Sequence, residues 1–166
     1  MAKAIYTGTF DPFTNGHLDI VDRARRNFDE LVILVARSDR KTALFSVEER
    51  VAMIQETIKN KKNVRVDSCE GLVVDYARKV GAQVLVRGLR AASDFEYEFM
   101  MAAMNRALNP KVETFFMMTG ENLYFVSSSM IKELYRFGGD VSPYLPATVV
   151  RYLKKKSFQK KGEGKS

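Results

Sequence analysis

Residues 3–21 read KAIYTGTFDPFTNGHLDIV. The stretch begins with an apolar run of strand length, and from Leu18 the apolar residues recur at helical spacing. Between the two, Gly8 lets a ligand approach the backbone closely, while Gly16 and His17 stand on the opening turn of the helix. That turn presents unbonded amides and the positive end of the helix dipole, which suit an anion. The stretch therefore predicts a strand-to-helix junction that binds phosphate.

The rest of the chain repeats the order of strand and helix. Apolar runs of strand length lie at 3–7, 31–36, 64–67, 83–87 and 112–117. Segments with helical apolar spacing lie between them. This alternation predicts an α/β fold, a Rossmann-like doubly wound five-stranded parallel sheet with helices on both faces. Such sheets bind ligands beyond the carboxyl ends of the strands, where the strand order reverses.

Local signals mark several helix ends. In two stretches, 46–49 and 93–96, a serine is followed three residues later by glutamate, which is the pattern of a capping box. Gly81 and Gly138 suit the left-handed residue that follows many helices. These signals predict two helix starts and two helix ends.

The composition favours one compact domain, which we expect over residues 1–153 of the 166. Cys69 is the only cysteine and His17 the only histidine, so the chain cannot supply a disulfide framework or a structural zinc cage. A lone thiol fits the reducing cytoplasm. The apolar run at the start is too short for a signal sequence or a membrane span, so we expect no membrane association.

The net charge of +7 raises the question of a nucleic-acid partner. Residues 151–166 hold seven Lys and Arg against Glu163 alone, which leaves the body of the chain nearly neutral. This end lacks the regularly interleaved aromatic residues of a nucleic-acid binder. We therefore expect residues 154–166 to form a basic, flexible tail and expect no nucleic-acid partner.

The candidate site residues are rich in anion donors and poor in acid–base pairs. The donors are His17, Lys41, Arg87, Arg90 and the serines 127–129. A phosphate monoester is already an anionic nucleophile at neutral pH, so its attack on a phosphoanhydride needs in-line positioning and charge neutralisation rather than a general base. The donor set therefore favours phosphoryl or nucleotidyl transfer.

Each donor also has an ordinary structural explanation. His17 could fill space or cap its helix, and Lys41 could be a solvated lysine in a charged loop. Arg87 and Arg90 could form surface ion pairs, and Ser127 could be a plain helix cap.

Three stretches resemble one known family. Residues 14–17, TNGH, resemble the T/HxGH signature of the nucleotidyltransferase superfamily, and the longer string 8–17, GTFDPFTNGH, resembles that of the bacterial phosphopantetheine adenylyltransferases. Residues 86–98, VRGLRAASDFEYE, and 126–132, VSSSMIK, resemble the second and third signatures of the same family. The order and spacing agree over roughly residues 3–150.

The resemblance implies the reversible transfer of the adenylyl group of ATP to 4′-phosphopantetheine, which yields dephospho-CoA and pyrophosphate. The attack would be direct and in line, without a covalent intermediate. Magnesium would be bound mainly through the ATP phosphates, with no metal held by the protein alone. The resemblance also implies a homohexamer built as a dimer of trimers and CoA as a feedback inhibitor.

The resemblance further assigns roles to residues. His17 would stabilise the pentacovalent transition state, with Lys41 and Arg90 as further catalytic groups. The residues implied for 4′-phosphopantetheine are Thr9, Lys41, Val73 and Arg87. Those implied for ATP are Thr9, Phe10, His17, Gly88, Leu89, Arg90, Glu98, Leu123, Tyr124, Phe125, Val126, Ser127, Ser128 and Ser129.

Alternatives remain open at this stage. Leu123 stands where many family members have tryptophan, Glu98 could be a solvated helix residue, and Val73 could simply be buried. Adenylyl- or cytidylyltransferases that act on another phosphate acceptor, such as nicotinate mononucleotide, share the first signature. A nucleic-acid-binding module with a vestigial nucleotide fold is the alternative from another class.

Overall fold

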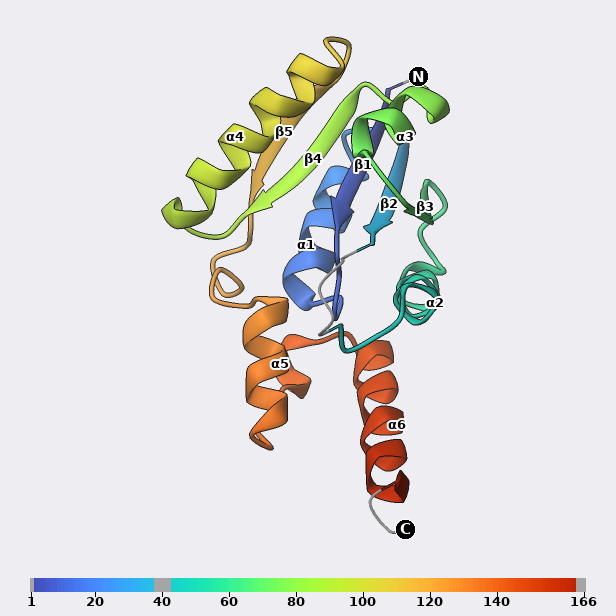
Figure 1. The fold of residues 1–166 in the computed structure, drawn as a ribbon, viewed down its shortest axis with the longest axis vertical. Coiled ribbons are helices and arrows are strands. Elements are labelled where there is room, and N and C mark those ends of the chain that lie inside the picture. Colours follow the sequence, from blue (N-terminus) through green and yellow to red (C-terminus); the bar gives the residue numbers. More distant parts are fainter. Residues whose placement is uncertain (1, 38–42, 164–166) are drawn as a thin grey trace.

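The computed structural model describes residues 2–37 and 43–163, without the side chains of 92, 93 and 157–163. Within these residues the strands are β1 (Lys3–Gly8), β2 (Glu30–Ala36), β3 (Val64–Cys69), β4 (Val84–Leu89) and β5 (Glu113–Met118). They form one sheet in the order β3-β2-β1-β4-β5, and every neighbouring pair is parallel (Figure 1). The predicted five-stranded parallel sheet is confirmed, with each strand where an apolar run predicted it.

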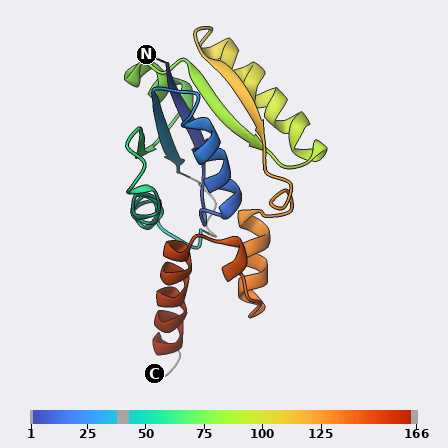
Figure 2. The same ribbon diagram turned by 180° about the vertical axis from the view of Figure 1, so that it is seen from behind.

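Helices cover both faces of this sheet. The helices are α1 (Asn15–Ala24), α2 (Val47–Ile58), α3 (Val73–Val80), α4 (Ala92–Leu108), α5 (Ser128–Arg136) and α6 (Ala147–Glu163), with a 3₁₀ helix at Ser142–Tyr144. Of these, α5 and α6 extend beyond the carboxyl ends of the strands (Figure 1). Helix α1 lies on one face and α3 and α4 on the other, as the two opposite views show (Figures 1 and 2). Alternate residues of β1 follow this division: Tyr6 joins the core beneath α1 and α2, whereas Ile5 joins the core beneath α3.

The helix ends agree with most of the local signals. Ser46 and Glu49 form the predicted capping box at the start of α2. Gly81, with φ of 70°, ends α3 in the left-handed conformation, and Gly138, with φ of 80°, follows α5 in the same conformation.

The capping box predicted at 93–96 is wrong. Helix α4 already begins at Ala92, and its N-cap Ala91 makes no side-chain capping bond. The helix start is instead tied back by Asp94, whose Oδ2 accepts the backbone amide of Arg90 at 3.3 Å. A carboxylate in the first turn also suits the helix dipole.

Helix α6 crosses the predicted boundary between domain and tail. Val149 and Leu153 pack in the core, and the helix continues past them to Glu163. Lys156 still touches the body, because its Nζ lies 2.9 Å from Oε2 of Glu49 and 5.5 Å from the ring centroid of Phe45. The structure therefore shows no break at 153, and the flexibility of the last residues stays a prediction. None of the described helices is long and apolar enough to cross a bilayer.

The strand order reverses between β1 and β4. From β1 the chain builds outward through β2 to β3, and it then returns to the other side of β1 to add β4 and β5. The carboxyl ends of β1 and β4 therefore lie side by side with connections leaving in opposite directions, which opens a crevice between them. This is where the sequence predicted the ligand site.

Candidate active site

A pocket of about 260 Å³ lies at the carboxyl ends of β1 and β4. Many of the residues predicted for the site line it: Thr9, Phe10, His17, Arg87, Gly88, Arg90, Glu98, Val126, Ser127, Ser128 and Ser129. They come from the β1–α1 junction, the β4–α4 junction and the turn before α5. Three segments that are far apart in the sequence thus meet at the predicted switch point.

An aromatic cluster shapes the β1–α1 junction. Phe10 has φ of 49°, and its buried ring lies edge-on to Tyr6 and Phe13, with centroid distances of 5.3 and 5.6 Å. A Cβ atom on Gly8 would lie 3.0 Å from the Phe10 ring, so a larger residue where the strand ends would require that ring to shift. His17 packs edge-on to Phe10 at 5.1 Å and stacks on Phe13 at 5.5 Å. The cluster therefore fixes the plane of the imidazole.

His17 closes a capping box with Thr14. The His17 amide bonds to the Thr14 hydroxyl at 3.3 Å, and the Thr14 amide donates to His17 Nδ1 at 2.9 Å. Since Nδ1 accepts a backbone proton, the neutral ring carries its own proton on Nε2. His17 thus caps the helix and also lines the pocket with a donor, while its catalytic role stays a prediction.

The charge state of His17 follows from its surroundings. Loss of solvation, and then the nearby Arg90 and Arg87, lower the pKa of His17 to about 3. The imidazole is therefore neutral at physiological pH and can donate a hydrogen bond without adding a full charge. A neutral donor of this kind can stabilise a developing oxyanion but is not set up to deliver a proton.

Arg87 is held by a two-pronged ion pair with Glu98. Its Nε and Nη2 donate to the carboxylate oxygens at 2.7 and 2.5 Å, while Nη1 donates to the Thr7 carbonyl at 2.6 Å. The side chain of Glu98 is only 11% exposed, so it is not the solvated helix residue that the sequence left open. Two of the five N–H groups of Arg87 remain for a ligand.

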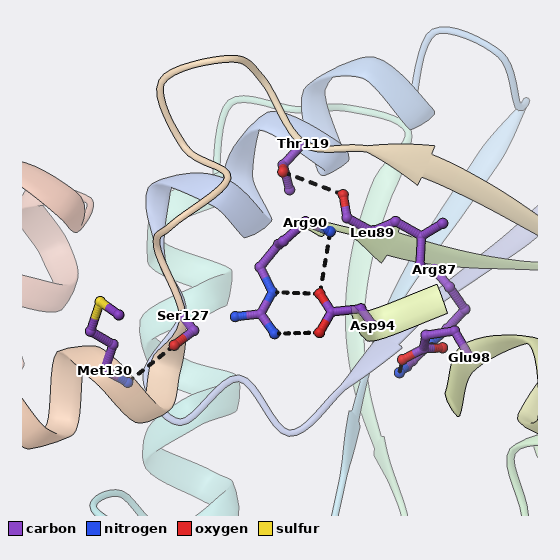
Figure 3. A network of polar contacts seen from close by, with 8 residues as sticks. All are labelled: Arg87, Leu89, Arg90, Asp94, Glu98, Thr119, Ser127 and Met130. Carbon is purple, nitrogen blue, oxygen red and sulfur yellow. Dashed lines mark hydrogen bonds and ion pairs between the residues drawn. The ribbon is translucent and has the colours of Figure 1, made fainter. Parts of the chain in front are cut away.

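Arg90 is held in a similar way by Asp94. Its Nε and Nη2 donate to the two carboxylate oxygens at 3.1 Å each. The third guanidinium nitrogen points away from Asp94, toward Ser127 (Figure 3). Two arginines with fixed planes therefore stand on one side of the pocket, each presenting donors that suit phosphate oxygens.

The serine turn forms the opposite side. Ser127 is the N-cap of α5, and its Oγ accepts the Met130 amide at 3.1 Å (Figure 3). Ser128 donates to the carbonyl of Pro12 at 2.8 Å, which docks the turn onto the β1–α1 junction. The pocket therefore lies between two helix starts, those of α1 and α5, whose amides attract anions.

Comparisons with known proteins agree with this geometry. A family model described as cytidylyltransferase-like matches residues 5–134. The phosphopantetheine adenylyltransferase of Syntrophus aciditrophicus is 52% identical over 92% of this chain and 93% of its own length, and that of Desulforudis audaxviator is 50% identical over 99% and 100%. The chain belongs to the phosphopantetheine adenylyltransferase family.

A solved structure supports the fold independently. The bifunctional NMN adenylyltransferase/ADP ribose pyrophosphatase of Francisella tularensis superposes with a TM-score of 0.72 at 16% identity, covering 93% of this chain. The chain spans 49% of the length of that protein. At this low identity the likeness concerns the fold alone.

Several residues that the family resemblance implied do not line this pocket. Leu89 is buried, Leu123 packs against the main core, and Tyr124 and Phe125 are exposed at 59% and 42%. Val73 begins α3 beyond β3, two strands from β1. Lys41 lies outside the described residues. The roles of these residues stay predictions.

The pocket also includes residues that sequence reasoning did not assign to it. Tyr6, Thr7 and Thr119 line it. Thr119 directly follows β5, and its amide bonds to the Leu89 carbonyl at 3.0 Å. Because parallel strands end at one edge of the sheet, the position of Thr119 just after the fifth apolar run could have revealed it. Tyr6 gave no such signal, since it stands inside a strand.

We predict that His17 does not titrate between pH 5 and 8 in the folded protein. Because folding lowers its pKa, the unfolded chain takes up this proton more readily, so stability falls as the pH drops from about 6.5 toward 3. The single histidine gives only one pair of imidazole C–H signals in a ¹H–¹³C NMR spectrum, so their assignment to His17 is unambiguous. Chemical shifts that follow a pKa near 6.5 in the folded state would contradict the prediction.

Proposed function

We propose that this chain transfers the adenylyl group of ATP reversibly to 4′-phosphopantetheine, giving dephospho-CoA and pyrophosphate. The observation that carries the proposal is the pocket in which a neutral histidine N–H lies between two anchored arginines and the start of α5. Every one of these groups donates to anions, and both carboxylates that line the described pocket, Asp94 and Glu98, are paired with arginine. Such a site suits charge neutralisation rather than proton transfer.

In the proposed reaction the phosphate of the acceptor attacks the α-phosphorus of ATP directly and in line. His17 Nε2–H donates to the α-phosphate as negative charge develops on it. Arg90 and the turn of Ser127, Ser128 and Ser129 bind the β- and γ-phosphates, and so stabilise the departing pyrophosphate. No covalent intermediate forms on the protein.

The acceptor phosphate is bound from the β1–β4 side. Arg87 and Thr9 are its proposed ligands, with Lys41 as a further catalytic and binding group and Val73 along the pantetheine arm. The nucleoside is bound by Phe10, Gly88, Leu89, Glu98 and the segment 123–126. Because Glu98 also anchors Arg87, the nucleoside side and the acceptor side share one ion pair.

Magnesium is the proposed cofactor, bound through the ATP phosphates. Among the described residues no group of three or more His, Cys, Asp or Glu could hold a metal ion. In this proposal the metal arrives with the nucleotide, where it would neutralise charge on the phosphates.

We further propose a cytoplasmic homohexamer, arranged as a dimer of trimers and inhibited by CoA. Helix α4 supports the assembly, because it exposes a row of large apolar side chains. These are Phe95, Tyr97, Phe99, Met100, Met101, Met104 and Leu108, exposed between 40% and 62%. A patch of this kind on a folded chain favours a protein partner, and a second copy of the chain is the proposed one.

The acceptor assay tests the proposed function. Purified protein with magnesium and ATP should release pyrophosphate when 4′-phosphopantetheine is added, and not with nicotinate mononucleotide or without an acceptor. If pyrophosphate is released with nicotinate mononucleotide instead, the proposed nucleotidyl transfer is correct but the proposed acceptor is wrong. Absence of release with every acceptor would leave a binding module as the better account.

A His17→Ala variant separates catalysis from binding. Because its proposed partner is charge in the transition state, turnover should fall by about 10²- to 10³-fold while the affinity for ATP changes little. Steady-state kinetics and calorimetric ATP titration measure the two quantities, and a melting curve checks that the loss of the helix cap leaves the protein folded. Equal losses of turnover and ATP affinity would refute this role.

A further inference from the structure

Asp11 is a buried carboxylate at the β1–α1 junction that does not line the pocket. It is 4% exposed and accepts three donors: the amide of Leu44 at 2.9 Å, the amide of Phe45 at 2.9 Å and Nζ of Lys132 at 2.9 Å. A buried charge is tolerated only when it is paired and hydrogen-bonded, as here. An aspartate that only formed a turn would not need this set of three donors, which indicates a further role for Asp11.

The three partners of Asp11 come from separate parts of the chain. Leu44 and Phe45 precede α2, whereas Lys132 lies on α5, four residues after Ser128. Asp11 itself stands between β1 and the turn that carries His17. One carboxylate therefore joins the histidine turn to the helix that presents the serine turn.

Two further contacts follow the same route. Ser128 Oγ donates to the carbonyl of Pro12, the residue next to Asp11. A Cβ atom on Gly16 would lie 3.9 Å from the Val126 carbonyl, so the start of α1 and the segment before the serines are in close approach. The ion pair of Asp11 and Lys132 is the charged member of this set, and its side chains are only 6% and 22% exposed.

We propose that Asp11 and Lys132 are positioning residues for nucleotidyl transfer. Their ion pair holds the histidine turn and the serine turn at a fixed separation. The bond between the α-phosphorus and the departing pyrophosphate is thereby aligned for in-line attack. Neither residue touches the substrates. The inference rests on the proposed function, since it assigns the two turns to the α-phosphate and to the β- and γ-phosphates.

Four variants test the proposal: Asp11→Asn, Lys132→Met, the double variant of these two, and Lys132→Arg. Asp11→Asn retains the Oδ1 atom, which accepts the amides of Leu44 and Phe45 at 3.1 and 2.9 Å, and replaces Oδ2, which accepts from Lys132 and also from the Leu44 amide. Lys132→Met removes the charge at similar length, and Lys132→Arg retains a cation. The matched control is Asp75→Asn, which breaks the exposed ion pair with Arg78 on α3.

Asp11→Asn and Lys132→Met should each lower kcat/KM for ATP by about 10- to 100-fold, with little change in KM for the acceptor. The double variant should be no worse than the singles, because the two residues act as one unit. Lys132→Arg should retain most of the activity, and Asp75→Asn all of it. Assays run well below each melting temperature separate this effect from unfolding.

Other results would overturn the proposal. Full activity in both single variants would show that the separation is fixed without the ion pair. Loss in Lys132→Met alone would show that the lysine acts on the nucleotide itself, and equal changes in both KM values would indicate a general structural role. The affinity of the same variants for magnesium–ATP can be measured by calorimetry without any acceptor. This measurement therefore remains valid even if the proposed acceptor is wrong.

Discussion

The hydrogen bond from the Thr14 amide to Nδ1 of His17 is the contact on which the site depends. It completes the cap of α1, which places a helix start at the carboxyl end of β1, and it leaves the imidazole proton on Nε2. The rings of Phe10 and Phe13 fix the plane of that imidazole. Another capping side chain at position 14 could also accept the amide of His17. The reciprocal bonds between Thr14 and His17 cap the helix and at the same time orient the imidazole N–H.

The two arginines of the pocket are fixed by carboxylates. Glu98 and Asp94 each hold one arginine with two hydrogen bonds, and outside the pocket Asp11 holds Lys132 of α5. The carboxylates limit the net positive charge of the pocket while the donors remain directed into it. Preorganised donors of this kind need little rearrangement as charge develops in a transition state, which is why positioning can replace acid–base chemistry here.

The sequence revealed the features that depend on local order. The strands followed from apolar runs, the junction from Gly8, Gly16 and His17, and the place of the pocket from the rule for parallel sheets. It did not reveal the pairs that depend on tertiary packing, such as Asp11 with Lys132, which are 121 residues apart. The cap predicted at 93–96 is wrong because α4 begins earlier, at Ala92, and Asp94 in its first turn accepts the amide of Arg90.

In the proposed reaction the site transfers the adenylyl group directly between bound substrates. The stereochemical course at the α-phosphorus tests it most directly, with ATP made chiral there by sulfur and oxygen isotopes and the configuration of the product read by ³¹P NMR. A single in-line displacement predicts inversion of configuration. Retention would require two displacements through a covalent intermediate on the protein and would contradict the account.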